Sequence, residues 1–313
     1  MLLQTVPDSM TPFQVTILGA GSAMPTTQHH PPSQLVNMNG MMFMIDCGEG
    51  TQVLMRRADI RIGKLHSIFI SHLHGDHIFG LPGLFSTLSL LGRTGDVTLY
   101  AHREIEALLE PFLAYMCSHL TFQINLVPLN PIGTAVLFEN RSVRISSFPL
   151  NHRVDTNGFL FEEKRRPNHI RKEMIEAYDI PFRAIRSIKQ GVDYTTGGGE
   201  VIPNERLTYP AHPPRRYAYC SDTAYDPAIV PYIRGVDLLY HEATFAESEK
   251  ERAKETFHST ARQAALIARE AGVGKLIIGH FSSRYRTFEP LLQEALEIFP
   301  HTELAVEGST IAL

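Results

Sequence analysis

Cysteine is scarce in this sequence: the 313 residues include only Cys47, Cys117 and Cys220. Three widely separated cysteines exclude a disulfide framework and a paired-cysteine zinc site, so we expect a cytoplasmic protein. No apolar run approaches membrane-spanning length, and the first residues lack the basic start and apolar stretch of a signal peptide. We therefore expect no membrane partner, and Met10 is an alternative start of the chain.

The chain also lacks an excess of positive charge. Its formal net charge is −4, whereas general nucleic-acid-binding domains are often strongly basic. Residues 161–190 are a local exception, because eight basic minus five acidic side chains leave a charge of +3. A solvated helical face would explain this cluster as well as a phosphate-binding surface would. The eight basic residues are Lys164, Arg165, Arg166, Arg171, Lys172, Arg183, Arg186 and Lys189.

Short apolar runs that end at an ionisable residue recur along the chain. Their length and their content of Ile, Phe, Leu and Tyr predict buried strands. Polar residues at the carboxyl ends of such strands then lie along a common sheet edge. The six runs cover residues 66–77, 41–46, 143–152, 215–222, 237–242 and 275–280.

Helical patterns alternate with these strands, at residues 51–58, 78–92 and 259–272, the last ending at Gly272. We expect a proline-rich loop between the strands at 13–21 and 41–50. The alternation favours an α/β fold, with two central sheets and helices outside. Residues 161–214 break this pattern, and their Gly197-Gly198-Gly199 run predicts a turn or mobile tip. We therefore expect one domain, 1–313, with an insertion at about 161–214.

The densest set of metal-binding side chains is His72-Leu-His74-Gly-Asp76-His77. In an extended segment His72 and His74 point the same way and can bind one cation. A turn at Gly75 would aim Asp76 and His77 at a neighbouring position. Four ligands from one stretch suit two adjacent ions that take further ligands from elsewhere. Those are available where other runs end, at His152, Asp222 and His280.

These donors are nitrogen and oxygen atoms without thiolate, which favours Zn²⁺, with Mn²⁺ or Fe as alternatives. Two adjacent ions favour hydrolysis, because they activate water and stabilise charge on a phosphoryl or acyl oxygen. A leaving group would need a separate acid. Glu242 and His258 could form a carboxylate–histidine pair for that purpose.

Further motifs narrow the interpretation. In order along the chain they are TILGAGSAMP, DCGEGTQ, FISHLHGDHIFGLPGLFSTL, a later NH, CSDT, HEATF, HST and GHFSSRY. With this set the chain resembles the ribonuclease Z family of the metallo-β-lactamase superfamily. These endonucleases remove the 3′ trailer from precursor tRNA, leaving a 3′-hydroxyl on the tRNA and a 5′-phosphate on the trailer. The resemblance implies an αβ/βα four-layer sandwich and two zinc ions per subunit.

The resemblance also implies roles for individual residues. One zinc would bind His72, His74 and His152. The other would bind Asp76, His77 and His280, with Asp222 bridging the two. Asp76 would in addition accept a proton, while Glu242 and His258 would help to protonate the leaving 3′ oxygen. Asp46 would orient a ligand histidine from behind.

Members of this family have a protruding arm that grips tRNA, and they dimerise so that the arm of one subunit serves the other. The resemblance therefore implies that residues 161–214 are this arm and that the eight basic residues bind phosphates. It implies precursor tRNA as substrate and a homodimer. The segment IPFRAIRSIKQG lacks the Gly-Pro pair that many such arms carry.

Two other functions fit these residues. A phosphodiesterase of small esters or other RNAs would use the same metals. A metal-bearing RNA-binding protein without catalysis would need no complete ligand set, so the intact set of histidines and aspartates argues against it.

Overall fold

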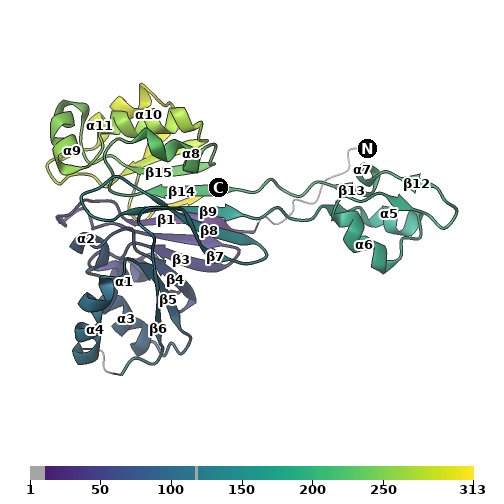
Figure 1. Ribbon diagram of the computed structural model, residues 1–313, viewed down its shortest axis with the longest axis horizontal. Helices are drawn as coiled ribbons and strands as arrows, with labels where there is room; N and C mark the ends of the chain where they lie inside the picture. The colour runs from purple at the N-terminus through teal and green to yellow at the C-terminus, as the bar shows by residue number, and fades with distance from the viewer. Residues whose placement is uncertain (1–10, 117–118) are drawn as a thin grey trace.

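The computed structural model describes residues 11–116 and 119–313 of the chain. The alternative start at Met10, together with Cys117, lies outside the described residues. Two seven-stranded sheets pack face to face at the centre, and helices flank them on both outer sides (Figure 1).

The first sheet has the strand order β18-β1-β2-β3-β4-β5-β6. Strands β3 to β6 run parallel, so their carboxyl ends share one edge. The strands are β1 Phe13–Gly19, β2 Ser33–Met38, β3 Met41–Ile45, β4 Leu65–Phe69, β5 Val97–Ala101, β6 Ile124–Pro128 and β18 Thr310–Ala312.

The prediction of only a loop between β1 and β3 is wrong, because β2 lies between them in the sequence and in the sheet. Its sequence, SQLVNM, is polar at Ser33 and Gln34, and yet both side chains are buried. With burial on both faces, β2 has no alternation of apolar and polar residues that would reveal a strand.

The second sheet has the order β17-β16-β15-β14-β9-β8-β7. Here β14 to β17 are parallel. The strands are β7 Ala135–Glu139, β8 Val143–Pro149, β9 Asn157–Glu163, β14 Arg216–Cys220, β15 Leu238–Glu242, β16 Lys275–Gly279 and β17 Thr302–Leu304. All six apolar runs that were predicted as strands are thus strands.

Three apolar layers hold the sandwich together. Aromatic side chains such as Phe43, Phe69, Phe161 and Tyr217 fill the space between the sheets. The outer faces of the two sheets are covered by separate sets of helices. On the first sheet lie α1 Thr51–Arg57, η1 Ile62–Lys64, α2 Gly75–Ile78, α3 Leu81–Leu90 and α4 Ile105–Met116. On the second lie η2 Pro227–Ile229, α8 Val230–Ile233, η3 Glu247–Glu249, α9 Lys250–Thr256, α10 Ala261–Ala271 and α11 Glu289–Leu296.

Helix α10 shows how the sequence sets the ends of an element. Thr260 and Gln263 form a reciprocal capping box at its start. Gly272 ends the helix with φ 63°, a left-handed conformation that glycine adopts without steric cost. The predicted helix and its stop at Gly272 are therefore confirmed.

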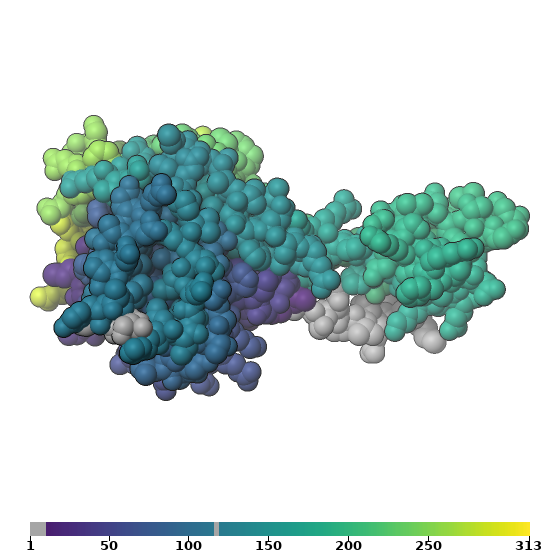
Figure 2. Space-filling view, turned by 60° about the horizontal axis from the view of Figure 1, so that its bottom comes forward, coloured from purple at the N-terminus to yellow at the C-terminus, as the bar shows by residue number. Residues whose placement is uncertain are grey.

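Between β9 and β14 the chain leaves the sandwich and forms a projecting arm (Figures 1 and 2). The head of the arm has a small core of Ile180, Ile188, Ile202 and Leu207. The three glycines lie in the turn that joins β11 to β12. The elements of the arm are β10 His169–Ile170, α5 Lys172–Ala177, α6 Phe182–Lys189, β11 Tyr194–Thr195, β12 Val201–Ile202, α7 Asn204–Leu207 and β13 Thr208–Tyr209.

Arg215 fixes the root of the arm to the sandwich. Its guanidinium donates to Glu163 at 2.7 and 2.8 Å, and to the carbonyls of Thr11 at 2.8 Å and Leu313 at 3.0 Å. Burial alone would raise the pKa of Glu163, but the hydrogen bonds and charge of Arg215 lower it below the usual value. The arm is thus tied to both ends of the described chain.

Candidate active site

The carboxyl ends of strands from both sheets meet at one edge of the sandwich. His72 follows β4, His152 follows β8, Asp222 follows β14 and His280 follows β16. Open α/β sheets bind their ligands outside the carboxyl ends of strands. The prediction that these ends share an edge is confirmed.

Two site residues have left-handed backbone conformations, Asp46 with φ 54° and His280 with φ 61°. A non-glycine residue held in this region costs on the order of 1–3 kcal/mol, and such residues cluster at functional sites. Both residues directly follow a strand, and their side chains contact the ligand groups at His77 and Asp222.

The first ligand group contains His72, His74, His152 and Asp222, whose donor atoms all lie within 4.8 Å of one another. His74 Nδ1 is 2.9 Å from His72 Nε2 and 3.4 Å from His152 Nε2. Asp222 Oδ2 is 3.6 Å from His72 Nε2 and 3.9 Å from His152 Nε2.

The second group contains Asp76, His77 and His280. Asp76 Oδ2 is 3.4 Å from His77 Nε2 and 3.6 Å from His280 Nε2. The other oxygen of Asp222, Oδ1, is 3.1 Å from His280 Nε2 and 3.6 Å from His77 Nε2. Asp222 thus turns one oxygen to each group.

The geometry of both groups fits a metal ion. Two ligand atoms 2.1 Å from a tetrahedral zinc are about 3.4 Å apart, and the separations here scatter around that value. His77 Nε2 and His280 Nε2 are buried without a hydrogen-bond partner among the described residues. Buried nitrogens without a hydrogen bond are unfavourable unless they bind something, and a cation would satisfy both.

The pKa shifts of three of the histidines and of both aspartates match this donor set. Burial lowers the pKa of His72, His74 and His152, so their imidazoles are neutral, as metal ligands must be. Burial alone would raise the pKa of Asp76 and Asp222, but neighbouring histidines lower both below the usual carboxyl range. Both aspartates are therefore ionised.

Asp46 holds one ligand from behind. Its carboxylate accepts from His77 Nδ1 at 2.8 Å, from the Tyr219 hydroxyl at 2.8 Å, and from the backbone and hydroxyl of Ser71 at 2.8 and 2.9 Å. This fixes the ring of His77 with Nε2 turned towards Asp76 and Asp222. The structure therefore puts Asp46 where the sequence expectation puts it.

Glu242 and His258 form a pair beside the two groups. His258 Nδ1 is 2.8 Å from Glu242 Oε1. Glu242 is fully buried and also accepts from the backbone of Thr223, Ser259 and Thr244 and from the Thr244 hydroxyl. Burial would lower the pKa of His258, but Glu242 raises it to about 9. His258 is also within 4.8 Å of donor atoms of Asp222 and His280.

These side chains line a cavity of about 340 Å³ that opens to solvent. His74, Asp76, His152, Asp222, His258 and His280 all contribute to its wall. Arg153 and Arg252 add positive charge to the lining. The structure thus brings the predicted metal ligands and the predicted acid pair together at one site, with His72, His77 and Glu242 behind the residues that line the cavity.

Three contributors were missed by sequence reasoning: Ser71, Tyr219 and Thr244. Thr244 bonds the Nδ1 atoms of His280 at 2.9 Å and His258 at 3.3 Å. Ser71 and Thr244 lie in the motifs FISHLHGDH and HEATF, next to predicted site residues. That position is the sequence signal that could have identified them. Tyr219 reaches Asp46 from the opposite sheet, and nothing local in the sequence indicates that contact.

The eight basic residues of the arm do not lie in this cavity. Lys164 pairs with Glu139 at 2.8 Å, and Arg166 donates to Asn39 at 2.9 Å and to Thr11. Arg171 donates to the Thr208 carbonyl and lies over the Tyr209 ring. The other five side chains have no ion-pair or hydrogen-bond partner within residues 11–116 and 119–313: Arg165, Lys172, Arg183, Arg186 and Lys189.

Sequence comparison decides the family. A ribonuclease Z of Parabacteroides distasonis is 53% identical over 304 residues, which are 97% of this chain and 100% of that protein. A ribonuclease Z of Bacteroides fragilis is 52% identical over the same shares of both chains. The chain belongs to the ribonuclease Z family. The family model described as Anti-Pycsar protein Apyc1 also matches residues 13–166, from β1 to the root of the arm.

Solved structures outside this close group share the fold. Human tRNase Z, short form, superposes with a TM-score of 0.68 at 24% identity, covering 95% of this chain and 98% of that chain. The metallo-β-lactamase fold protein YhfI of Bacillus subtilis has a TM-score of 0.68 at 18% identity, covering 96% and 100%. The αβ/βα sandwich expected of a ribonuclease Z is confirmed.

Proposed function

We propose that this ribonuclease Z cuts the 3′ trailer from precursor tRNA, leaving a 3′-hydroxyl on the tRNA and a 5′-phosphate on the trailer. Sequence identity of 53% and 52% to two proteins named ribonuclease Z, over 97% of this chain, supports the substrate and the reaction. The observation that carries the chemistry is the position of Asp222, with one oxygen turned to each ligand group. That arrangement suits phosphodiester hydrolysis with two metal ions.

Two zinc ions per subunit fit the donors, with Mn²⁺ or Fe as alternatives. His72, His74 and His152 would hold one ion, and Asp76, His77 and His280 the other, with Asp222 between them. When bound, the metals supply a water nucleophile at neutral pH and stabilise charge on the phosphoryl oxygens.

The chain's own side chains supply the proton transfers. Asp76, ionised at the edge of the cavity, accepts a proton from the attacking water. His258, with its pKa raised to about 9 by Glu242, is protonated at neutral pH and faces the cavity. It can therefore donate a proton to the 3′ oxygen as the phosphodiester breaks. Asp46 keeps His77 oriented and acts on no substrate atom.

The arm is proposed to hold the tRNA. In our interpretation residues 1–313 form one domain, and the insertion at about 161–214 is its substrate-binding arm. Phosphate contacts position a nucleic acid without reading its sequence. Five basic side chains of the arm, which have no partner within the described ranges, are available for such contacts, whereas Lys164 and Arg166 also serve the root.

A homodimer is proposed as the working assembly. The neighbouring helices α3 and α4 (Figure 1) present large apolar side chains to solvent, with Leu90 85%, Leu108 53% and Tyr115 86% exposed. Such a surface suits burial against a second copy. We place the activity in the cytoplasm, because Cys47 and Cys220 are unbonded thiols. Within the described part of the chain, no helix is long and apolar enough to cross a membrane.

Mapping the products of one trailer-bearing tRNA tests the proposal. We expect one cut directly after the discriminator nucleotide, with the end groups named above. Bis-aryl phosphate hydrolysis, measured on the same preparation, reports whether the metal site is active. Good hydrolysis of the small ester without any cut in the tRNA would instead identify a small-ester phosphodiesterase.

A further inference from the structure

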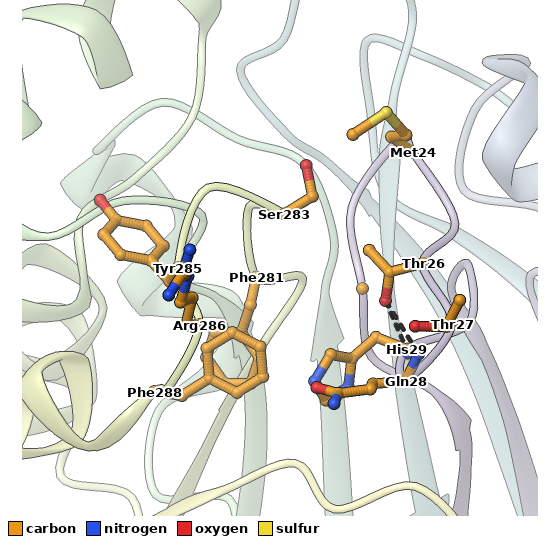
Figure 3. Close-up of a pocket in the computed structure, with 11 residues that line it drawn as sticks. Met24, Thr26, Thr27, Gln28, His29, Phe281, Ser283, Tyr285, Arg286 and Phe288 are labelled. Carbon is orange, nitrogen blue, oxygen red and sulfur yellow. Dashed lines mark hydrogen bonds between the residues drawn. The ribbon is translucent and has the colours of Figure 1, made fainter.

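A second cavity, of about 360 Å³, lies beside the active-site cavity. Two loops from opposite ends of the sequence face each other across it (Figure 3). One loop carries Met24, Gln28 and His29, and the other carries Phe281, Tyr285 and Phe288. None of these residues belongs to the ligand groups or to the acid pair.

A single β-bridge between the two loops separates the two cavities. Gly21 pairs with Phe281 in this bridge, and the Ser22 amide donates to the Phe281 carbonyl at 3.0 Å. Ser22 and Ser282 line the active-site cavity, whereas Gly21 and Phe281 line the second one. The second cavity therefore adjoins the active-site cavity on the side of Ser22 and Ser282.

The second cavity is lined by flat rings. Phe281 and Phe288 stack with ring centroids 4.1 Å apart and planes at 22°. The His29 ring lies 4.8 Å from Phe288. The Tyr285 hydroxyl accepts from the Ala246 amide at 2.9 Å, which fixes that ring. Phe281 is buried and supports the half-buried Phe288 ring from behind. A flat ring supported in this way suits stacking with a nucleobase, which binds sequence-tolerantly through its flat face.

Polar groups at the cavity are free to meet a base edge. The side chains of Gln28 and Arg286 line the cavity, and neither has a hydrogen-bond or ion-pair partner in the described part of the chain. Thr26 shapes this loop, because its hydroxyl accepts from the backbone amides of Gln28 and His29 at 3.2 and 2.9 Å. Figure 3 shows these two bonds within the loop that carries Thr26.

We infer that this cavity binds the base of the first trailer nucleotide. The inference rests on the proposed function, in which His258 protonates the 3′ oxygen of the tRNA. A series of hydrogen bonds leads from His258 to the second cavity. His258 contacts the Thr244 hydroxyl, and the Thr244 carbonyl accepts from the Ser282 amide. Next to Ser282, the Phe281 carbonyl accepts from the Ser22 amide. The last tRNA nucleotide lies at the His258 end of this series, so the trailer runs towards Ser22 and the second cavity.

Precursor tRNAs with a single abasic nucleotide test the inference. With the wild-type enzyme, removing the base of the first trailer nucleotide should lower kcat/KM about tenfold, the size of effect expected for one lost stacking contact. Phe288→Leu keeps apolar volume but removes the flat ring. This variant should cleave the normal precursor more slowly and should cleave the abasic and normal precursors at nearly equal rates.

Phe299→Leu is the matched control, because Phe299 packs against the same apolar cluster as Phe288 but does not line the cavity. It should keep the tenfold response to the abasic nucleotide. Arg286→Ala, an exposed change, gives a second variant if Phe288→Leu folds poorly, and it should reduce the response to the missing base.

Three results would overturn the inference. The wild-type enzyme could cleave the abasic precursor as fast as the normal one. The Phe288→Leu and Arg286→Ala variants could keep the full response. Phe288→Leu could remove the response to a missing base at the last tRNA nucleotide and leave the response at the first trailer nucleotide unchanged. Absence of any tRNA cleavage, with bis-aryl phosphate hydrolysis intact, would overturn the proposed function itself, which distinguishes the two failures.

Discussion

The strand-end site and the arm use ionisable side chains in opposite ways. At the site Asp46 accepts four hydrogen bonds and Glu242 five, and both are fully buried. On the arm, five basic side chains have no partner among the described residues, and Phe182 is 89% exposed. Catalysis needs side chains that are held in place before the substrate arrives. Binding a nucleic acid needs positive charges that no protein group has already neutralised.

The largest expected effect is at the centre of the site. Among the residues that the structure describes, Asp222 is the one side chain that faces both ligand groups, so Asp222→Ala should abolish cleavage of precursor tRNA and of bis-aryl phosphate alike. Metal analysis of the purified variant should show fewer bound ions than the wild type. Unchanged metal content with unchanged activity would contradict the bridging role.

His258→Ala separates metal binding from proton donation. Loss of a general acid typically costs roughly a hundredfold to ten-thousandfold in rate, and we expect kcat on precursor tRNA to fall within that range. A bis-aryl phosphate with a good leaving group needs no acid, so its hydrolysis should fall much less. An equal loss on both substrates would show that His258 mainly supports the metal ligands.

Arg183→Ala combined with Arg186→Ala tests the arm. We expect KM for precursor tRNA to rise and its dependence on salt to weaken, because each lost phosphate contact reduces the salt slope by about one. Arg141→Ala combined with Arg234→Ala, two exposed arginines of the sandwich, should leave both quantities unchanged. If the two pairs behave alike, the arm is not a specific tRNA contact.

The ion pair at the root of the arm should affect how Tm depends on pH in acid. The pKa of Glu163 is lower in the folded protein than its ordinary value of 4.5. Its ion pair with Arg215 therefore stabilises the fold above that pH, and this stabilisation is lost as the pH falls through the lowered folded value. Glu163→Gln should lower Tm at neutral pH and flatten the decline of Tm in acid. Glu162→Gln, its neighbour in β9, is the control and should leave this decline unchanged.

The site was more predictable than the fold around it. Residues such as His72, Asp222 and His280 stand at the ends of apolar runs. The same sequence pattern therefore predicts both the strand and the metal ligand at its end. Strand β2 escaped because its polar residues Ser33 and Gln34 are buried.

Contacts between distant segments were not predictable. Tyr219 reaches Asp46 across the gap between the sheets, and the loop at Gln28 meets Phe288 from the other end of the sequence. Such approaches depend on how the sheets pack, and no local spacing encodes them. The five basic side chains of the arm that lack a partner in the described part of the chain could be separated from Lys164 and Arg166 only once their neighbours were known.

The most direct test compares the full chain with a variant in which residues 167–210 are replaced by a short Gly-Ser linker. Both proteins are assayed on trailer-bearing tRNA and on bis-aryl phosphate. The full chain should cut the tRNA after the discriminator nucleotide, and the variant should lose most of this activity while keeping small-ester hydrolysis. Equal tRNA cleavage by both proteins, or none by the full chain, would contradict the division of labour between the site and the arm.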